Sequence, residues 1–413
     1  MPPMSGPDEP SDIPAPLAGV RVLALEQMQA LPYATQLLGR LGADVVKIES
    51  PAGGDQGRGS LPAMSDPEGR RVGATFTRNN LEKKSICIDL KHPRGRELVL
   101  ALAPKFDVVA ENFKSGTADR LGIGYDDIRA VHPSCIYLSI SGFGNTVPTP
   151  YATWPAFAPI VEAMSGIYEL KRRDDDPPVT APVGGLGDLS AALFATIGVL
   201  AALRQRDQSG VGQYIDIAMF DSVVAMTDVV MNFWSLGQRG GEASPLISHG
   251  FQTGDGWIII QTGREHQFAA LMRLIGHPEW IDDERFATRQ GWVDHLDDVL
   301  RPAIEKWASG MTRMEACAVL GDAGIAAGPC FNDDEVVEDP HLRARGMVVE
   351  IPRSDGEAQP VLTPGNPVRM SGLRPRHEQR VPWLGEHTSD VLAHELALGP
   401  DEIEDLRREG VVA

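Results

Sequence analysis

The chain has 413 residues, of which 42% are hydrophobic and 23% charged, and both values are typical of a globular protein with two domains. Its formal net charge of -19 argues against nucleic acid or an anionic membrane as a partner, because both require a basic surface. The chain lacks a run of about 20 apolar residues, and residues 1–16, rich in proline and acid, do not resemble a signal peptide. We expect a disordered tail over 1–16 and a cytoplasmic protein.

The cysteines and histidines do not predict a metal site. The four cysteines are widely spaced, and two of them, Cys87 and Cys135, lie in apolar runs typical of buried strands. The ten histidines form no pair with metal-ligand spacing.

Short β-branched runs alternate with helical patterns through the first half of the chain. The expected strands cover 19–25, 43–49, 85–90, 107–112, 135–141 and 213–219, with helices over 35–41, 95–103 and 189–204. Strands of this length separated by helices predict an α/β fold with a Rossmann-like, mostly parallel sheet. The turn after the first strand lacks G-x-G-x-x-G, so the sequence does not predict a dinucleotide site.

A second unit begins after the polar residues 237–250. The run GFQTGDGWIIIQTG (250–263) has the pattern of a β-hairpin, and three helical patterns follow it. We therefore expect a large domain formed by 17–240 and 355–413 and a small α+β domain over 250–350.

Asp188 is the strongest candidate for a catalytic residue. It follows Gly184, Gly185 and Gly187 and opens a long apolar helix, which predicts an N-cap whose carboxylate stays ionised in the field of the helix. Such a carboxylate can attack a thioester carbonyl, and the glycines leave backbone N–H groups for a developing oxyanion. The alternative is that Asp188 only caps the helix.

Basic residues concentrate between Gly69 and Arg96 in this acidic chain. The segment contains eight lysines and arginines against only Glu82 and Asp89. A phosphate-bearing ligand and a solvated basic surface both remain open as explanations.

Several blocks in the same order resemble the family III CoA-transferases, the group that contains formyl-CoA:oxalate and carnitine CoA-transferases. The matching blocks are 16–55, NLEKKSICIDLKHPRGRE (80–97), VVAENFKSGTADRLGIGYD (108–126), LSISGFGNTVP (138–148), GVGQYIDIAMFDSV (210–223) and 384–412. By this resemblance, Asp188 matches the catalytic aspartate and Gln29 a glutamine beside the thioester. The resemblance also implies CoA contacts at Arg58, Ile88, Lys91, Asn112, Phe113, Arg120 and Phe143.

The resemblance implies a CoA-transferase that moves CoA from an acyl-CoA to a carboxylic acid, with a dicarboxylate as the expected acceptor, through an aspartyl-CoA thioester. It also implies an interlocked homodimer without a prosthetic group, with acyl-CoA and small carboxylates as its ligands.

Two alternatives remain at this stage. The same fold serves α-methylacyl-CoA racemases, which need a histidine for reprotonation, but Phe157 occupies that position here. Glu162 is a substitute base in that scheme, although its place in the sequence favours a helix surface. The other alternative is a protein that binds CoA without catalysis.

Overall fold

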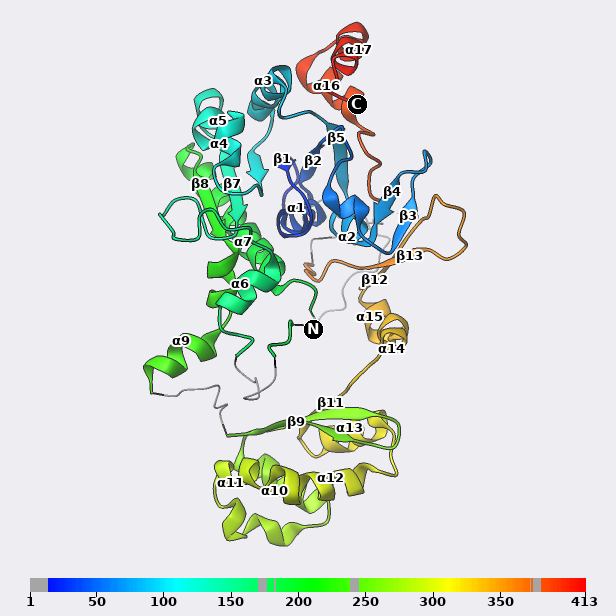
Figure 1. The fold of residues 1–413 in the computed structure, drawn as a ribbon. Helices are drawn as coiled ribbons and strands as arrows, with labels where there is room; N and C mark the ends of the chain where they lie inside the picture. Colours follow the sequence, from blue (N-terminus) through cyan, green and yellow to red (C-terminus); the bar gives the residue numbers. More distant parts are fainter. Residues whose placement is uncertain (1–13, 170–176, 182, 238–244, 372, 374–379) are drawn as a thin grey trace. The chain divides into compact units, whose positions relative to one another are not determined.

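The structure, a computed structural model, describes residues 14–169, 177–181, 183–237, 245–371, 373 and 380–413. The chain divides into two compact units (Figure 1), unit 1 formed by residues 1–239 and 343–413 and unit 2 by residues 240–342. The N-terminal residues 1–13 of the expected tail lie outside the described residues.

Unit 1 is built on a six-stranded sheet in which every pairing is parallel. The strands in spatial order are β5 (Lys83–Cys87), β2 (Asp44–Glu49), β1 (Arg21–Leu25), β6 (Val108–Glu111), β7 (Ile136–Ser141) and β8 (Tyr214–Ala218). Each strand lies within three residues of its expected bounds, and the α/β prediction is confirmed.

Two apolar layers cover the two faces of this sheet, because successive side chains of each strand point in opposite directions. Val22 and Ala24 pack with one group of helices, whereas Leu23 and Leu25 pack with another. The first group is α1 (Ala30–Arg40), α6 (Ala158–Met164), α7 (Leu186–Ser209) and α8 (Met219–Ala225). The second group is α3 (Pro93–Leu102), α5 (Tyr125–Val131), α16 (Thr388–Leu396) and α17 (Pro400–Arg408).

The C-terminal helices belong to unit 1 because they are tied to its edge strand β5. The Ser85 carbonyl accepts the His387 N–H, and the Thr388 hydroxyl accepts the Cys87 N–H at 3.0 Å. Smaller elements of this unit are β3 (Ala63–Ser65), β4 (Arg71–Gly73), α2 (Ala74–Asn79), α4 (Thr117–Leu121), α9 (Asp228–Ser235), β12 (Val348–Ile351) and β13 (Val361–Pro364).

Helix α7 is longer than its predicted bounds of 189–204. It begins at Leu186 and ends at Ser209, and it is long and apolar enough to span a membrane by length and composition, with a mean hydropathy of 1.9. Half of this apolar segment is buried in the layer with α1, α6 and α8. Leu193, Ile197 and Leu200 are exposed in the single chain.

Unit 2 is a three-stranded antiparallel sheet with helices on one face. The expected hairpin is confirmed by β9 (Ile247–Gln252) and β10 (Trp257–Thr262), which pair antiparallel, and β11 (Ala326–Pro329) completes the sheet. The helices α10 (Glu265–Leu274), α11 (Arg289–Asp294), α12 (Arg301–Ala308) and α13 (Arg313–Asp322) pack on it around Phe268 and Trp292, and α14 (Asp333–Glu338) follows.

Candidate active site

A pocket of unit 1 lies where the strand order of the sheet reverses. Strands β1 and β6 are neighbours, but the chain proceeds from β1 outward to β2 and from β6 outward to β7. Ligands of open α/β sheets bind at this kind of reversal, beyond the carboxyl ends of the strands. Residues that follow β1, β6 and β7 line the pocket, which has a volume of about 270 Å³.

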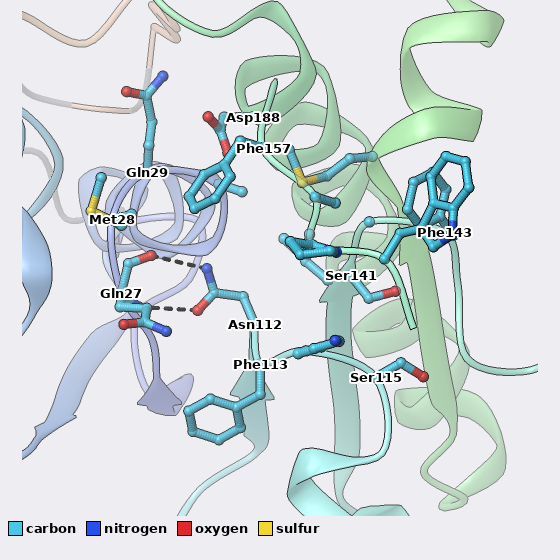
Figure 2. Close-up of a pocket in the computed structure, with 18 of the residues that line it drawn as sticks. Gln27, Met28, Gln29, Asn112, Phe113, Ser115, Ser141, Phe143, Phe157 and Asp188 are labelled. Carbon is cyan, nitrogen blue, oxygen red and sulfur yellow. Dashed lines mark hydrogen bonds between the residues drawn. The ribbon is translucent and has the colours of Figure 1, made fainter. Parts of the chain in front are cut away.

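Gln27 and Asn112 connect the loops after β1 and β6 (Figure 2). The Gln27 N–H donates to Asn112 Oδ1 at 3.0 Å, and Asn112 Nδ2 donates to the Gln27 carbonyl at 2.9 Å. The Asn112 amide is therefore used to hold two loops together at the floor of the pocket.

Buried charges fix the loop after β1. Met28 adopts a φ of 64°, a conformation that costs free energy for a side chain other than glycine, and its N–H donates to Asp55 Oδ1 at 2.8 Å. Lys47 binds Asp55 at 2.7 Å and the Glu26 carbonyl at 3.1 Å, while Lys83 binds the Glu26 carboxylate at 2.6 Å. Because Glu26, Lys47 and Lys83 have fully buried side chains, the loop rests on a rigid ionic support.

Asp188 enters the pocket from the first turn of α7. The helix begins at Leu186 with Gly185 as its N-cap at a φ of 104°, so Asp188 is the third helical residue. The prediction of an N-cap position was wrong by three residues, because the αL conformation of Gly185 starts the helix earlier.

Asp188 and Gln29 approach the same point in space. A Cβ atom placed on Gly185 would lie 2.9 Å from Asp188 Oδ2 and 3.2 Å from Gln29 Nε2. Gln29 Nε2 donates to the Gly184 carbonyl at 2.9 Å, which joins the loop after β1 to the turn before α7. The glycine at 185 leaves the space in which a carboxylate and an amide face each other.

The environment of Asp188 raises its pKa to about 6, first through burial and second through the negative charge of Glu162. The carboxylate is still mostly ionised at neutral pH, and its higher basicity makes it a better nucleophile.

Aromatic residues and one lysine form the other walls. Phe113 and Phe143 line the pocket, and the ring of Phe143 packs against Tyr151 with centroids 5.2 Å apart. Lys114 also lines the pocket, where its ammonium group donates to the Thr153 carbonyl at 2.6 Å. The sequence did not predict Lys114 as a site residue, although it directly follows Asn112 and Phe113.

The family model for CoA-transferase family III matches residues 17–388. The chain is 35% identical over 386 residues to a succinate–glutarate CoA-transferase of Agrobacterium fabrum, covering 92% of this chain and 95% of that protein. It is 33% identical to the β subunit of a succinyl-CoA–L-malate CoA-transferase of Chloroflexus aurantiacus, covering 96% and 98%. The crystal structure of a CAIB/BAIF family protein from Brucella suis is similar, with a TM-score of 0.80 and 35% identity over 93% of this chain and all of that chain.

The chain belongs to CoA-transferase family III.

For this family III CoA-transferase, the structure brings together part of the expected site. Gln29, Asn112, Phe113, Phe143 and Asp188 line one pocket.

The remaining four expected contacts, Arg58, Ile88, Lys91 and Arg120, lie outside this pocket. Lys91 and Arg120 are exposed, and Arg120 donates to the Thr117 hydroxyl at 2.8 Å. These two cations lie on the turn before α3 and on α4.

Arg58 and Ile88 are not placed as the resemblance implied. The Arg58 guanidinium makes two bonds to the Glu49 carboxylate, at 2.7 and 2.6 Å, and its carbon lies 3.7 Å from the centre of the Phe76 ring. Ile88 is fully buried in the apolar layer beneath α3 and α16. Their CoA contacts stay predictions; one side chain is used in a buried ion pair and the other in the core.

Phe157 and Glu162 complete the surroundings of Asp188. Phe157 lines the pocket and is 62% exposed. The described pocket-lining residues contain no histidine. Glu162 is only 2% exposed, so its assignment to a helix surface was wrong.

Proposed function

We propose that this enzyme transfers CoA from an acyl-CoA of the succinyl-CoA class to a dicarboxylic acid, through an aspartyl-CoA thioester on Asp188. The observation that carries the proposal is the half-buried Asp188 carboxylate facing Gln29 at the strand reversal. The dicarboxylate class is supported by two relatives, whose names pair succinate with glutarate and succinyl-CoA with L-malate.

The first half-reaction loads CoA onto the enzyme. The Asp188 carboxylate attacks the thioester carbonyl, the C–S bond breaks, and a mixed anhydride and the CoA thiolate form. The thiolate then attacks the Asp188 carbonyl of this anhydride, which releases the donor acid as a carboxylate and leaves an aspartyl-CoA thioester.

The second half-reaction repeats these steps in reverse with the acceptor. Its carboxylate attacks the aspartyl thioester, and the released thiolate attacks the acceptor carbonyl of the new anhydride. Asp188 returns as a free carboxylate. The side-chain amide of Gln29, 3.2 Å from the point above Gly185, is placed to donate to a carbonyl oxygen that becomes negative.

The test is to trap the intermediate. Wild-type enzyme incubated with succinyl-CoA and then with hydroxylamine should carry a hydroxamate on Asp188, detected by peptide mass spectrometry. A panel of acids offered as acceptors, with product CoA esters identified by mass, should give activity with dicarboxylates and little with monocarboxylates of the same length.

The matched control is Asp207→Asn, which removes an exposed carboxylate from the same helix. This variant should retain the hydroxamate and the exchange activity. An unmodified Asp188 in an enzyme that exchanges CoA would refute the aspartyl-CoA scheme. Exchange restricted to monocarboxylates would refute the substrate class.

We also propose that the enzyme is a homodimer joined along α7. Leu193, Ile197 and Leu200 are 45%, 61% and 37% exposed, and their spacing places them on one side of the helix. A contiguous apolar stripe of this kind favours an interface. Light scattering coupled to size exclusion should give twice the chain mass for the wild type and a monomer for Ile197→Glu; a wild-type monomer would refute the proposal.

A further inference from the structure

Helix α6 presents a second carboxylate to the turn that carries Asp188. Glu162 Oε1 accepts the Gly187 N–H at 3.0 Å, and its other oxygen accepts the Tyr168 hydroxyl. Gly187 directly precedes Asp188, so Glu162 is bonded to the backbone of the helical turn from which Asp188 projects.

The contact between α6 and this turn depends on the absence of a side chain at 187. A Cβ atom there would lie 2.7 Å from Val161 Cγ2 and 3.1 Å from Ala158 Cα, both on α6. These two distances are too short for ordinary packing, so only glycine allows α6 to approach closely enough for Glu162 to reach the backbone.

The Gly187 N–H is therefore not free to stabilise an oxyanion, contrary to the sequence expectation. It donates to Glu162 in the resting enzyme. The bond instead orients the first turn of α7, and this turn sets the position of the Asp188 backbone.

The electrostatic surroundings of Glu162 consist of an anion and a phenol. The ionisable groups that respond to it are Asp188 on α7 and Tyr168 after α6, and both pKa values are raised, first by burial and then by Glu162. On the adjacent helix α8, Asp221 responds to Asp216 and not to Glu162. The bonds to Glu162 come from a neutral amide and a neutral hydroxyl, and neither neutralises its charge.

We propose that Glu162 is a positioning residue, which holds the Asp188 turn through the Gly187 N–H and whose negative charge keeps the Asp188 carboxylate basic and reactive. This inference rests on the proposed function of Asp188 as the nucleophile. A nearby anion disfavours the ionised carboxylate of the ground state, and attack on a thioester disperses that charge into the anhydride and the thiolate.

The test is Glu162→Gln, which keeps an oxygen that can accept the Gly187 N–H but removes the charge. The acid limb of the kcat–pH profile should move down from a midpoint of about 6, by on the order of half a pH unit. Near pH 8, kcat should fall by up to about threefold, since a carboxylate that is about half a pKa unit less basic is a weaker nucleophile, while the KM for acyl-CoA stays unchanged.

Two variants serve as controls. Tyr168→Phe removes the hydroxyl but keeps the Glu162 charge, so the midpoint should stay near the wild-type value. Asp221→Asn removes an exposed carboxylate from α8, the neighbouring helix, and should leave both the midpoint and kcat unchanged.

The inference would be overturned if the acid limb of the kcat–pH profile of Glu162→Gln kept its wild-type midpoint. It would also be overturned if kcat fell equally at every pH and the Tm fell with it, because Glu162 would then have only a structural role. Hydroxylamine trapping separates this result from failure of the proposed function. If wild-type Asp188 is modified and the Glu162→Gln midpoint does not move, only the positioning role fails. If wild-type Asp188 is never modified, the nucleophile itself is wrong.

Discussion

Two groups of carboxylates in unit 1 that are withdrawn from solvent differ in their partners. Beneath the loop after β1, Glu26 and Glu49 bind Lys83 and Arg58 at 2.6 Å each. Burial alone would raise their pKa values, but the cations lower both below the ordinary value. By contrast, Asp188 is near an anion, and its pKa is raised to about 6.

The difference shows how one fold uses carboxylates for two purposes, to hold the backbone in place and to provide a reactive group. A carboxylate neutralised by a buried cation is a weak nucleophile but a strong constraint on the backbone, as at Met28. A carboxylate that is buried without a cation is destabilised as an anion and therefore reacts. The predictions below test this contrast.

The largest effect is expected for Asp188→Asn. Exchange should fall about a thousandfold or more because the nucleophile is lost, while CoA binding measured by calorimetry persists. Since the ionised Asp188 is disfavoured in the folded state, the same change should raise the free energy of unfolding at pH 7 by about 1–3 kcal/mol. Residual exchange within tenfold of wild type, or a loss of stability, would break the contrast.

Lys47→Met should have the opposite effect on stability. It leaves the buried Asp55 carboxylate without its cation and Glu26 with Lys83 alone, so the free energy of unfolding measured in urea should fall by about 3–5 kcal/mol. Lys84→Met removes the exposed pair with Asp44 and should cost about 0.2–1 kcal/mol. Equal losses in the two variants would show that the buried cluster is not a special support.

Gly187→Ala should have a smaller effect on stability. The added methyl group overlaps Val161 and Ala158, so we expect a loss of about 1–3 kcal/mol in unfolding free energy and a reduced kcat as the Asp188 turn shifts. Gly321→Ala on α13, where a Cβ meets open space, is the matched control and should be neutral or stabilising. A fully active, stable Gly187→Ala enzyme would contradict the close packing of α6.

The smallest effect is expected when the pH is lowered: exchange activity should fall at a higher pH than the one at which the fold is lost. The raised pKa of Asp188 means that exchange should fall about tenfold per unit below pH 6. Glu26 and Glu49 have lowered pKa values, so their contribution to stability is present above the unfolded value of about 4.3 and is lost only as pH falls further. Circular dichroism should therefore stay native at pH 5 while kcat declines; coincident loss of both would contradict the contrast.

The sequence by itself determined the strands and singled out Asp188 as the candidate nucleophile. Runs such as DVVKIE (44–49) and IYLSIS (136–141) are short and rich in β-branched and apolar residues, and their alternation with helical patterns predicts a mostly parallel sheet. The glycine turn before Asp188 and the ordered blocks of family resemblance located the residue that faces Gln29.

Only the tertiary structure decided which charges are paired and which are not. In the sequence, Arg58 resembles a phosphate contact. In the structure, its guanidinium donates two hydrogen bonds to the carboxylate of Glu49 at the end of β2. Glu162 has a helix-surface pattern, but α6 packs on α7 over a glycine and buries it beside Asp188. The pKa of a carboxylate depends on the cations and anions within a few ångströms, and these neighbours come from segments far apart in the chain, which local sequence does not specify.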